Sequence, residues 1–204
     1  MKKGILISLL VLCGVILLSC KTEEEKAQQV CEKYIREKVL RSKTTITIVS
    51  FSTLNAEQIK KEFLDREIFV TIKCVNHSYA TLQVVKNASV SDLPDLLKPD
   101  KLKRTIHEYS VKMQDIERFW INTQNRLNDG SYSYYQIEYE KINKDNIHTP
   151  TTKYLVVENA TKKVCELSQM FDNEKSYTSF ESNAASPSIE EDLAAIQEIY
   201  DSLK

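Results

Sequence analysis

The stretch VCEKYIREKVLRSKTTITIVSFS, from Val30 to Ser52, changes its hydrophobic period halfway along and so defines the first two elements of the fold. From Glu23 to Leu40 apolar residues recur at three- and four-residue spacing with charge on the other face, which predicts an amphipathic helix. From Thr44 to Ser52 β-branched residues take over, which predicts a strand. The chain therefore begins with a helix followed directly by a strand.

Inside that strand the alternation changes phase. Ile46 and Ile48 share one face, whereas Val49 and Phe51 follow the opposite phase. One extra residue in a strand produces this shift, so we expect a β-bulge or an edge bend. Next, Asn55 with a glutamine three residues later predicts a capped short helix that runs to Leu64.

The segment EIFVTIKCV, from Glu67 to Val75, alternates apolar and polar residues and is predicted to be a strand. The turn residues 76–78 would lead into a partner strand, YATLQVV, from Tyr79 to Val85. Pro94 and Pro99 then mark a polar connection.

Residues 101–128 are predicted to form the longest helix, because an apolar stripe with four- and three-residue spacing runs along them. Such a stripe is typical of a buried core face. Alternatively it could contact a partner, since Trp and Tyr are favoured at protein interfaces, and its Tyr109 and Trp120 are therefore candidate partner-binding residues.

The segments 132–142, 152–159 and 162–170 alternate apolar and polar residues and predict an antiparallel meander with a tight turn at 159–161. Tyrosines crowd the first of these strands. We expect one pair to fill the core and the other to face outward, which makes Tyr132 and Tyr134 candidate partner-binding residues. Cross-strand packing of tyrosines is the alternative interpretation.

The segment SIEEDLAAIQEIYDSLK, residues 188–204, predicts a second amphipathic helix. Ser188 and Glu191 have the spacing of a capping box. The apolar stripe of this helix should be buried, either on its own domain or in a partner, and its Tyr200 is a further candidate contact.

This order of elements predicts an α+β fold in which the N-terminal helix packs on a curved antiparallel sheet, with a long helical insert and a C-terminal helix. The plan, with the motifs at Val30–Ser52, YYQIEYEKIN and TKYLVVEN, resembles cystatin-like and NTF2-like domains and small bacterial lipoproteins that share it. The resemblance spans about residues 24–170 and implies a fold but no catalytic residue.

Lys2 and Lys3 are followed by an apolar stretch from Gly4 to Leu18, which is too short to span a bilayer comfortably and is typical of a secretory signal. Its end, Leu17-Leu18-Ser19-Cys20, resembles the lipobox of bacterial lipoproteins, which implies acylation of Cys20 and cleavage before it. The alternatives are an ordinary cleaved signal with an incidental cysteine, or an uncleaved anchor. Two or more acyl chains hold a protein stably on a membrane.

We therefore expect a signal peptide at 1–19, a lipidated tether at 20–26, an α+β domain at 27–170, a linker at 171–187 and a C-terminal helix at 188–204. The expected location is the bacterial envelope, in the outer membrane. The acidic run Glu23-Glu24-Glu25 resembles a surface-export signal, and surface display and a periplasmic position both remain open.

Composition excludes several function classes. Lys2 and Lys3 belong to the signal, so 26 of the 28 basic residues remain against 29 acidic ones, and the net charge offers nothing to nucleic acid. Of three glycines, Gly4 and Gly14 also belong to the signal, which leaves Gly130. Phosphate-binding loops, dinucleotide fingerprints and nucleophile elbows need at least two glycines, so no such cofactor is expected.

No metal site is expected either, because His107 has Val111, not a second histidine, four residues on. His77 and His148 lie in predicted loops, where they could meet Cys74 or Asp145. Glu138 and Glu140 share one strand face at a separation that carboxylate-pair hydrolases can use, and alternating charge on a solvent-exposed strand face is the simpler explanation. Of the cysteines beyond Cys20, buried thiols are the simplest interpretation, and Cys74–Cys165 is the candidate disulfide.

These observations favour a non-enzymatic lipoprotein that binds another envelope component, with a protein as the candidate partner. One alternative is an NTF2-like pocket enzyme acting on envelope glycan or a small molecule, which a pocket filled by Tyr34 and Ile35 would exclude. The other is an inhibitor or immunity lipoprotein with a protruding acidic or aromatic loop.

Overall fold

The computed structural model describes residues 22–40, 44–87, 89, 93–175 and 188–204. The chain divides into two compact units. The sheet unit contains the described residues up to Thr53 together with Tyr134–Glu166. The helical unit contains Leu54–Ser133 and Leu167–Lys204. The predicted signal peptide and Cys20 lie outside the described residues.

The sheet unit contains one helix and a four-stranded antiparallel sheet whose strand order follows the sequence, β1-β2-β3-β4. Its elements are α2 (Glu23–Leu40), β1 (Thr45–Thr53), β2 (Tyr132–Ile142), β3 (His148–Glu158) and β4 (Val164–Glu166). The predicted first helix, first strand and meander are confirmed. The last predicted strand is too long, because only Val164–Glu166 pairs with β3, and the chain is helical from Leu167.

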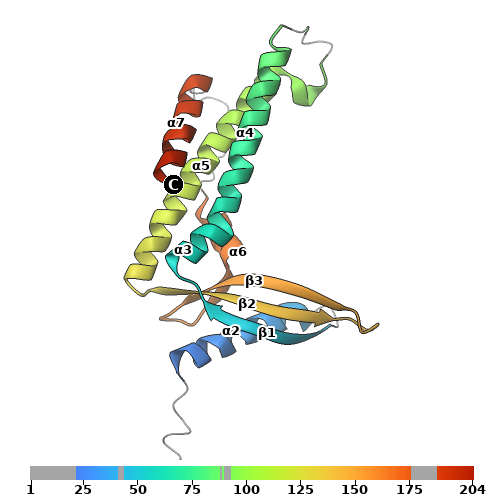
Figure 1. The fold of residues 1–204 in the computed structure, drawn as a ribbon, viewed down its shortest axis with the longest axis vertical. Helices are drawn as coiled ribbons and strands as arrows, with labels where there is room; N and C mark the ends of the chain where they lie inside the picture. Colours follow the sequence, from blue (N-terminus) through green and yellow to red (C-terminus); the bar gives the residue numbers. More distant parts are fainter. Residues whose placement is uncertain (1–21, 41–43, 88, 90–92, 176–187) are drawn as a thin grey trace, which may run out of the picture. The chain divides into compact units, whose positions relative to one another are not determined.

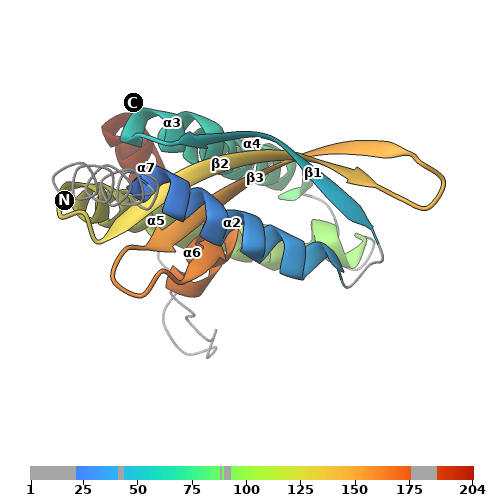
Figure 2. The ribbon, with the colours of Figure 1, turned by 90° about the horizontal axis from the view of Figure 1, so that it is seen from below.

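Helix α2 lies across one face of this sheet (Figure 2). Ala27, Cys31 and Ile35, spaced four residues apart, put one side chain per turn into the core cluster. From the sheet, the same cluster contains Tyr135, Ile137, Tyr139, Leu155 and Val157. The predicted α+β fold, with a helix packed on an antiparallel sheet, is confirmed.

The predicted bulge in β1 is also confirmed. The register with β2 shifts between Ile48, which lies opposite Tyr139, and Ser50, which lies opposite Glu138. Val49 is the extra residue, and its side chain is 61% exposed. The bulge lets both Ile48 and Phe51 pack on the core side, and Phe51 stacks on Tyr135 at 4.8 Å.

The helical unit contains α3 (Ala56–Ile59), the π-helical turn η1 (Lys60–Leu64), α4 (Asp65–Val85), the short η3 (Asp95–Leu97), α5 (Pro99–Asn128), α6 (Leu167–Glu174) and α7 (Ile189–Ser202). The capping boxes at Asn55–Gln58 and Ser188–Glu191 are both present, as predicted. Of the expected linker 171–187, the first four residues belong to α6, and 176–187 lie outside the described residues.

The two strands predicted between Glu67 and Val85 are wrong, because this whole segment is helix α4. Its buried residues are Ile68, Thr71, Val75, Ser78, Leu82 and Val85, which follow a helical and not an alternating period. The buried hydroxyl of Thr71 donates to the Glu67 carbonyl oxygen at 2.8 Å, so the helix itself satisfies this polar group.

Helices α4, α5 and α7 lie side by side (Figure 1). One end of the bundle buries Leu82, Val85, Leu102 and Ile106, with Ile189 and Leu193 of α7 packed against them. Elsewhere Phe63, Phe119 and Phe171 pair at centroid distances of 5.2 to 6.0 Å and connect η1, α5 and α6. Arg126 of α5 also binds Glu174 of α6 at 2.6 Å.

None of the described helices has both the length and the apolar character needed to cross a bilayer.

Burial of Cys31 leads to a prediction about thiol chemistry. Cys31 is 0% exposed, and burial, with a smaller effect of the Glu32 carboxylate, raises the pKa of its thiol from 9.0 to about 12. Because the thiolate is the reactive form, iodoacetamide at mildly alkaline pH should modify the half-buried Cys74 and Cys165 and spare Cys31. Peptide mass spectrometry would measure this.

The unfolded chain is the control, since all three thiols should then react. Folding keeps Cys31 protonated at pH values where the unfolded thiol ionises, so this residue should lower the free energy of unfolding as pH rises from 9.0 towards about 12. Equal native labelling of Cys31 and Cys74 would contradict the prediction.

Candidate functional site

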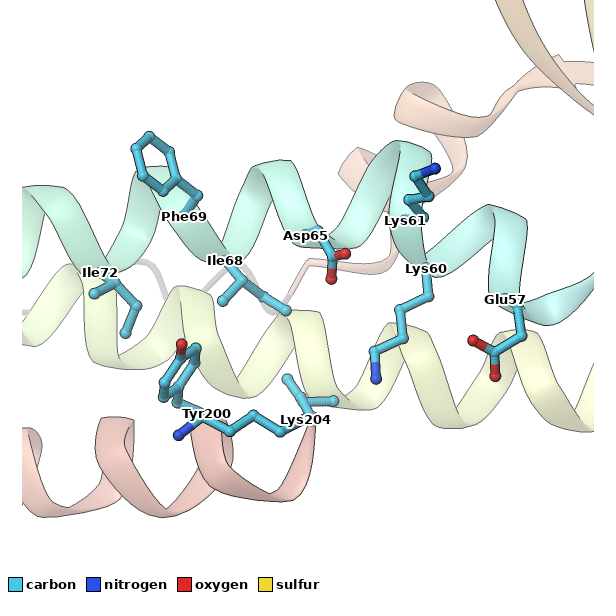
Figure 3. A pocket seen from close by; sticks show the side chains of 10 residues that line it. Glu57, Lys60, Lys61, Asp65, Ile68, Phe69, Ile72, Tyr200 and Lys204 are labelled. Atoms are coloured by element: carbon cyan, nitrogen blue, oxygen red, sulfur yellow. The ribbon is translucent and has the colours of Figure 1, made fainter.

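A groove of about 460 Å³ opens on the surface of the helical unit, and it is the candidate functional site. The start of α4 with the turns before it forms one wall, and the end of α7 forms the other (Figure 3). The lining residues are Glu57, Lys60, Lys61, Asp65, Ile68, Phe69, Ile72, Tyr200, Leu203 and Lys204.

The floor of the groove is apolar. Ile68 and Ile72 of α4 point towards α7, and Tyr200 points back at them, whereas Phe69 points away from α7 (Figure 3). Leu203, which is buried, completes the floor. Such a surface suits an apolar side chain of a ligand, which is removed from water on binding.

The rim of the groove carries charge of both signs. Among the described residues, neither Lys60 nor Lys61 forms an ion pair, and neither do Glu57 or Asp65. Lys204 by contrast binds Asp201 at 2.6 Å and lies 4.4 Å from the centre of the Tyr200 ring. The two unpaired lysines could bind carboxylates on an incoming ligand.

A π-helical turn shapes one wall. The capping box at Asn55 starts α3, and η1 follows at Lys60–Leu64 before the regular α4 begins. A π turn adds a residue to a helix and occurs often at functional sites. Here it contains both Lys60 and Lys61, so the irregular turn sets their directions relative to the floor on α4.

The other wall depends on the docking of α7. Ile196 is 4% exposed and packs in the bundle, and Asp192 is also 4% exposed. His107 of α5 reaches both carboxylate oxygens of Asp192 through Nδ1, each at 3.1 Å. This part-buried contact joins the first turn of α7 to α5, and Tyr200 lies about two turns further along the same helix.

The groove contains none of the side-chain sets that acyl or phosphoryl transfer needs. Its lining has no histidine, cysteine or serine, and its ionisable groups are the lysines of the rim with Glu57 and Asp65. Among the residues that the structure describes, no three His, Cys, Asp or Glu side chains gather as metal ligands would.

Of the five aromatic residues predicted to contact a partner, Tyr200 alone lines this groove. Tyr109 is half-buried, and its hydrogen bond with Cys74, together with burial, raises its pKa. Trp120 is half-buried on α5, and the Tyr132 ring lies 5.2 Å from the Arg126 guanidinium. Tyr134 is 1% exposed, so it offers no ring to a partner.

Sequence reasoning missed the residues of the α4 wall, because it placed 67–75 in a strand. Ile68 and Ile72 were assigned to one strand face, and Lys60 to a short isolated helix. The missed signal is that no glycine or proline occurs between Asn55 and Leu93, so nothing interrupts the helix that Asn55 starts.

The candidate disulfide is not formed. Cys74 belongs to helix α4 of the helical unit and Cys165 to strand β4 of the sheet unit, and both are thiols. The prediction of a strand at 67–75 had placed Cys74 in a sheet, where a cross-strand bond to Cys165 was plausible. Cys20, the predicted lipidation site, lies outside the described residues.

The other polar candidates take ordinary surface positions. His77 is exposed on α4, not in a loop, and His148 binds Glu140 at 2.8 Å where β3 starts. Glu138 accepts hydrogen bonds from Ser50 and Gln136. These carboxylates thus support the sheet and do not face each other across a cavity.

A scan of protein-family models, a search of curated proteins and a search of solved structures each found no match to this chain.

The contact between His107 and Asp192 leads to a prediction. Asp192→Ala removes the acceptor for a part-buried imidazole, so α7 should dock more weakly by about 1 to 3 kcal/mol. Hydrogen–deuterium exchange should rise across Ile189–Ser202 by roughly tenfold or more, while α4 and α5 keep their protection.

Glu198→Ala is the matched control, since it removes an exposed carboxylate from the same helix and should leave exchange unchanged. Equal exchange in both variants would show that the Asp192 contact does not hold α7.

Proposed function

We propose that this protein is a lipid-anchored, non-enzymatic binding module of the bacterial envelope, and that the α4–α7 groove binds a protein partner. The apolar floor of the groove, with unpaired charges beside it, is the observation on which the binding role rests. The tether is proposed from the lipobox-like residues Leu17–Cys20.

The rim suggests the chemistry of the partner. Lys60 and Lys61 lie on one wall without ion pairs among the described residues, and the floor accepts apolar atoms. A segment with an apolar anchor next to acidic residues matches both features. Anchors of this kind usually dominate binding energy, whereas rim charges affect the rate of association and specificity.

The packing of the sheet unit disfavours the alternative of a pocket enzyme. An NTF2-like enzyme would use the concave face of the sheet, next to the N-terminal helix. Ile35 is 2% exposed in the core cluster on this face, and Tyr34 packs against it. This packing supports a binding role over a substrate pocket on the sheet.

The proposed anchor can be tested by fractionation. Cys20→Ala should remove the sulfur that accepts the lipid, so the protein should shift from the membrane fraction to the soluble fraction and lose its acyl mass. Cys31→Ala is the matched control, because it removes a cysteine that the structure buries. Unmodified wild-type protein, by intact mass, would overturn the anchor but not the groove.

The groove can be tested with a photo-crosslinking phenylalanine analogue in place of Tyr200 in the full chain on intact cells. We expect a crosslinked protein at this position, and none from the same analogue at Tyr79, which is 38% exposed on α4 outside the groove. Lys60→Glu should weaken crosslinking by about tenfold through charge reversal, whereas Lys86→Glu should not.

Crosslinks of equal strength from both positions would contradict a specific groove. So would a small molecule that copurifies with the protein and is lost in Ile72→Glu, because the site would then be a ligand pocket.

A further inference from the structure

Within the part of the chain that the structure describes, strand β1 forms an open edge of the sheet. It comes first in the strand order and pairs on one side with β2. The opposite edge belongs to β4, which has only three residues, whereas β1 has nine. Natural proteins usually protect a long edge with charge or proline, because its free N–H and C=O groups pair readily with other strands.

Strand β1 has neither charge nor proline, and its one device of this kind is a bulge. Between Thr44 and Asn55 the sequence contains no charged residue and no proline. The one irregularity is the bulge at Val49, an apolar side chain that is 61% exposed. An exposed valine at the centre of an uncharged edge is better suited to pairing than to solvent.

The sequence of β1 has a two-fold pattern about the bond between Ile48 and Val49. Read outward in either direction, apolar and hydroxyl residues alternate in the same order, as TITI before the bond and VSFS after it. The bulge makes this pattern structural, because Ile46, Ile48 and Phe51 all pack on the core side. The hydroxyl residues of β1 lie on the face of the sheet away from this core: Thr45, Thr47, Ser50 and Ser52.

We propose that β1 pairs with β1 of a second copy of this chain, antiparallel and about a two-fold axis near Val49. In this register Ile46 meets Phe51 of the second copy on the core side, and Thr47 meets its Ser50 on the outer side. Apolar residues thus lie opposite apolar ones and hydroxyls opposite hydroxyls, which are favourable cross-strand pairs. Pairing with a strand of a different protein would not require a two-fold pattern in β1, so the pattern favours a second copy of this chain.

The same geometry limits the assembly to two copies. A two-fold contact uses the same edge of each copy, so it closes on itself. The edges left at the ends of the joined sheet are the two short β4 strands. A dimer and not a fibre is therefore the expected product.

The test uses charge at Val49, where an exposed side chain can change without loss of the fold. Val49→Lys places two ammonium groups beside the proposed axis, and Val49→Glu places two carboxylates there. Each variant alone should dimerise about tenfold more weakly than the wild type, and an equimolar mixture should recover a heterodimer. Sedimentation of the full chain in detergent would measure these states.

Ile147→Lys is the matched control, since Ile147 is 58% exposed in the same unit and should leave the dimer unchanged. A wild-type chain that stays monomeric at the highest soluble concentration would overturn the proposal, even if it captured another protein through β1. A dimer that survives both Val49 substitutions, or a mixture that stays monomeric, would overturn it too.

Discussion

The helical unit depends on one unbroken helical path from Ala56 to Val85. The capping box at Asn55 starts it, the π turn at Lys60–Leu64 continues it, and no glycine or proline stops it. Helix α4 packs along α5, and Thr71 satisfies its own hydroxyl within the helix. Only a continuous helix puts Ile68 and Ile72 one turn apart on the surface that faces α7.

The same helices form a long insertion between two neighbouring strands of the sheet. Strands β1 and β2 are neighbours in the sheet, and Thr53 lies opposite Tyr135, yet residues 54–131 lie between them in the sequence. Two long antiparallel helices carry the chain out and bring it back, so both ends of the insertion meet at the sheet. The sheet unit thus accommodates a large insertion without changing its strand order.

Elements with a single strong local signal could be predicted from the sequence. The apolar stripe of α2, the phase shift at Val49 and the caps at Asn55 and Ser188 each have one physical cause within a few residues. The segment 67–75 misled because its β-branched residues alternate, while its packing against α5 decided the structure. The groove could not be predicted, since Ile68 and Tyr200 meet only through the docking of α7.

The insertion has a kinetic consequence. During synthesis β1 emerges long before β2. Until the helical insertion between them has been made, β1 has no β2 to pair with. The helices fold through local contacts, whereas the β1–β2 ladder must wait for a distant segment, which is a slow step. Until β2 arrives, this uncharged strand is therefore exposed to aggregation.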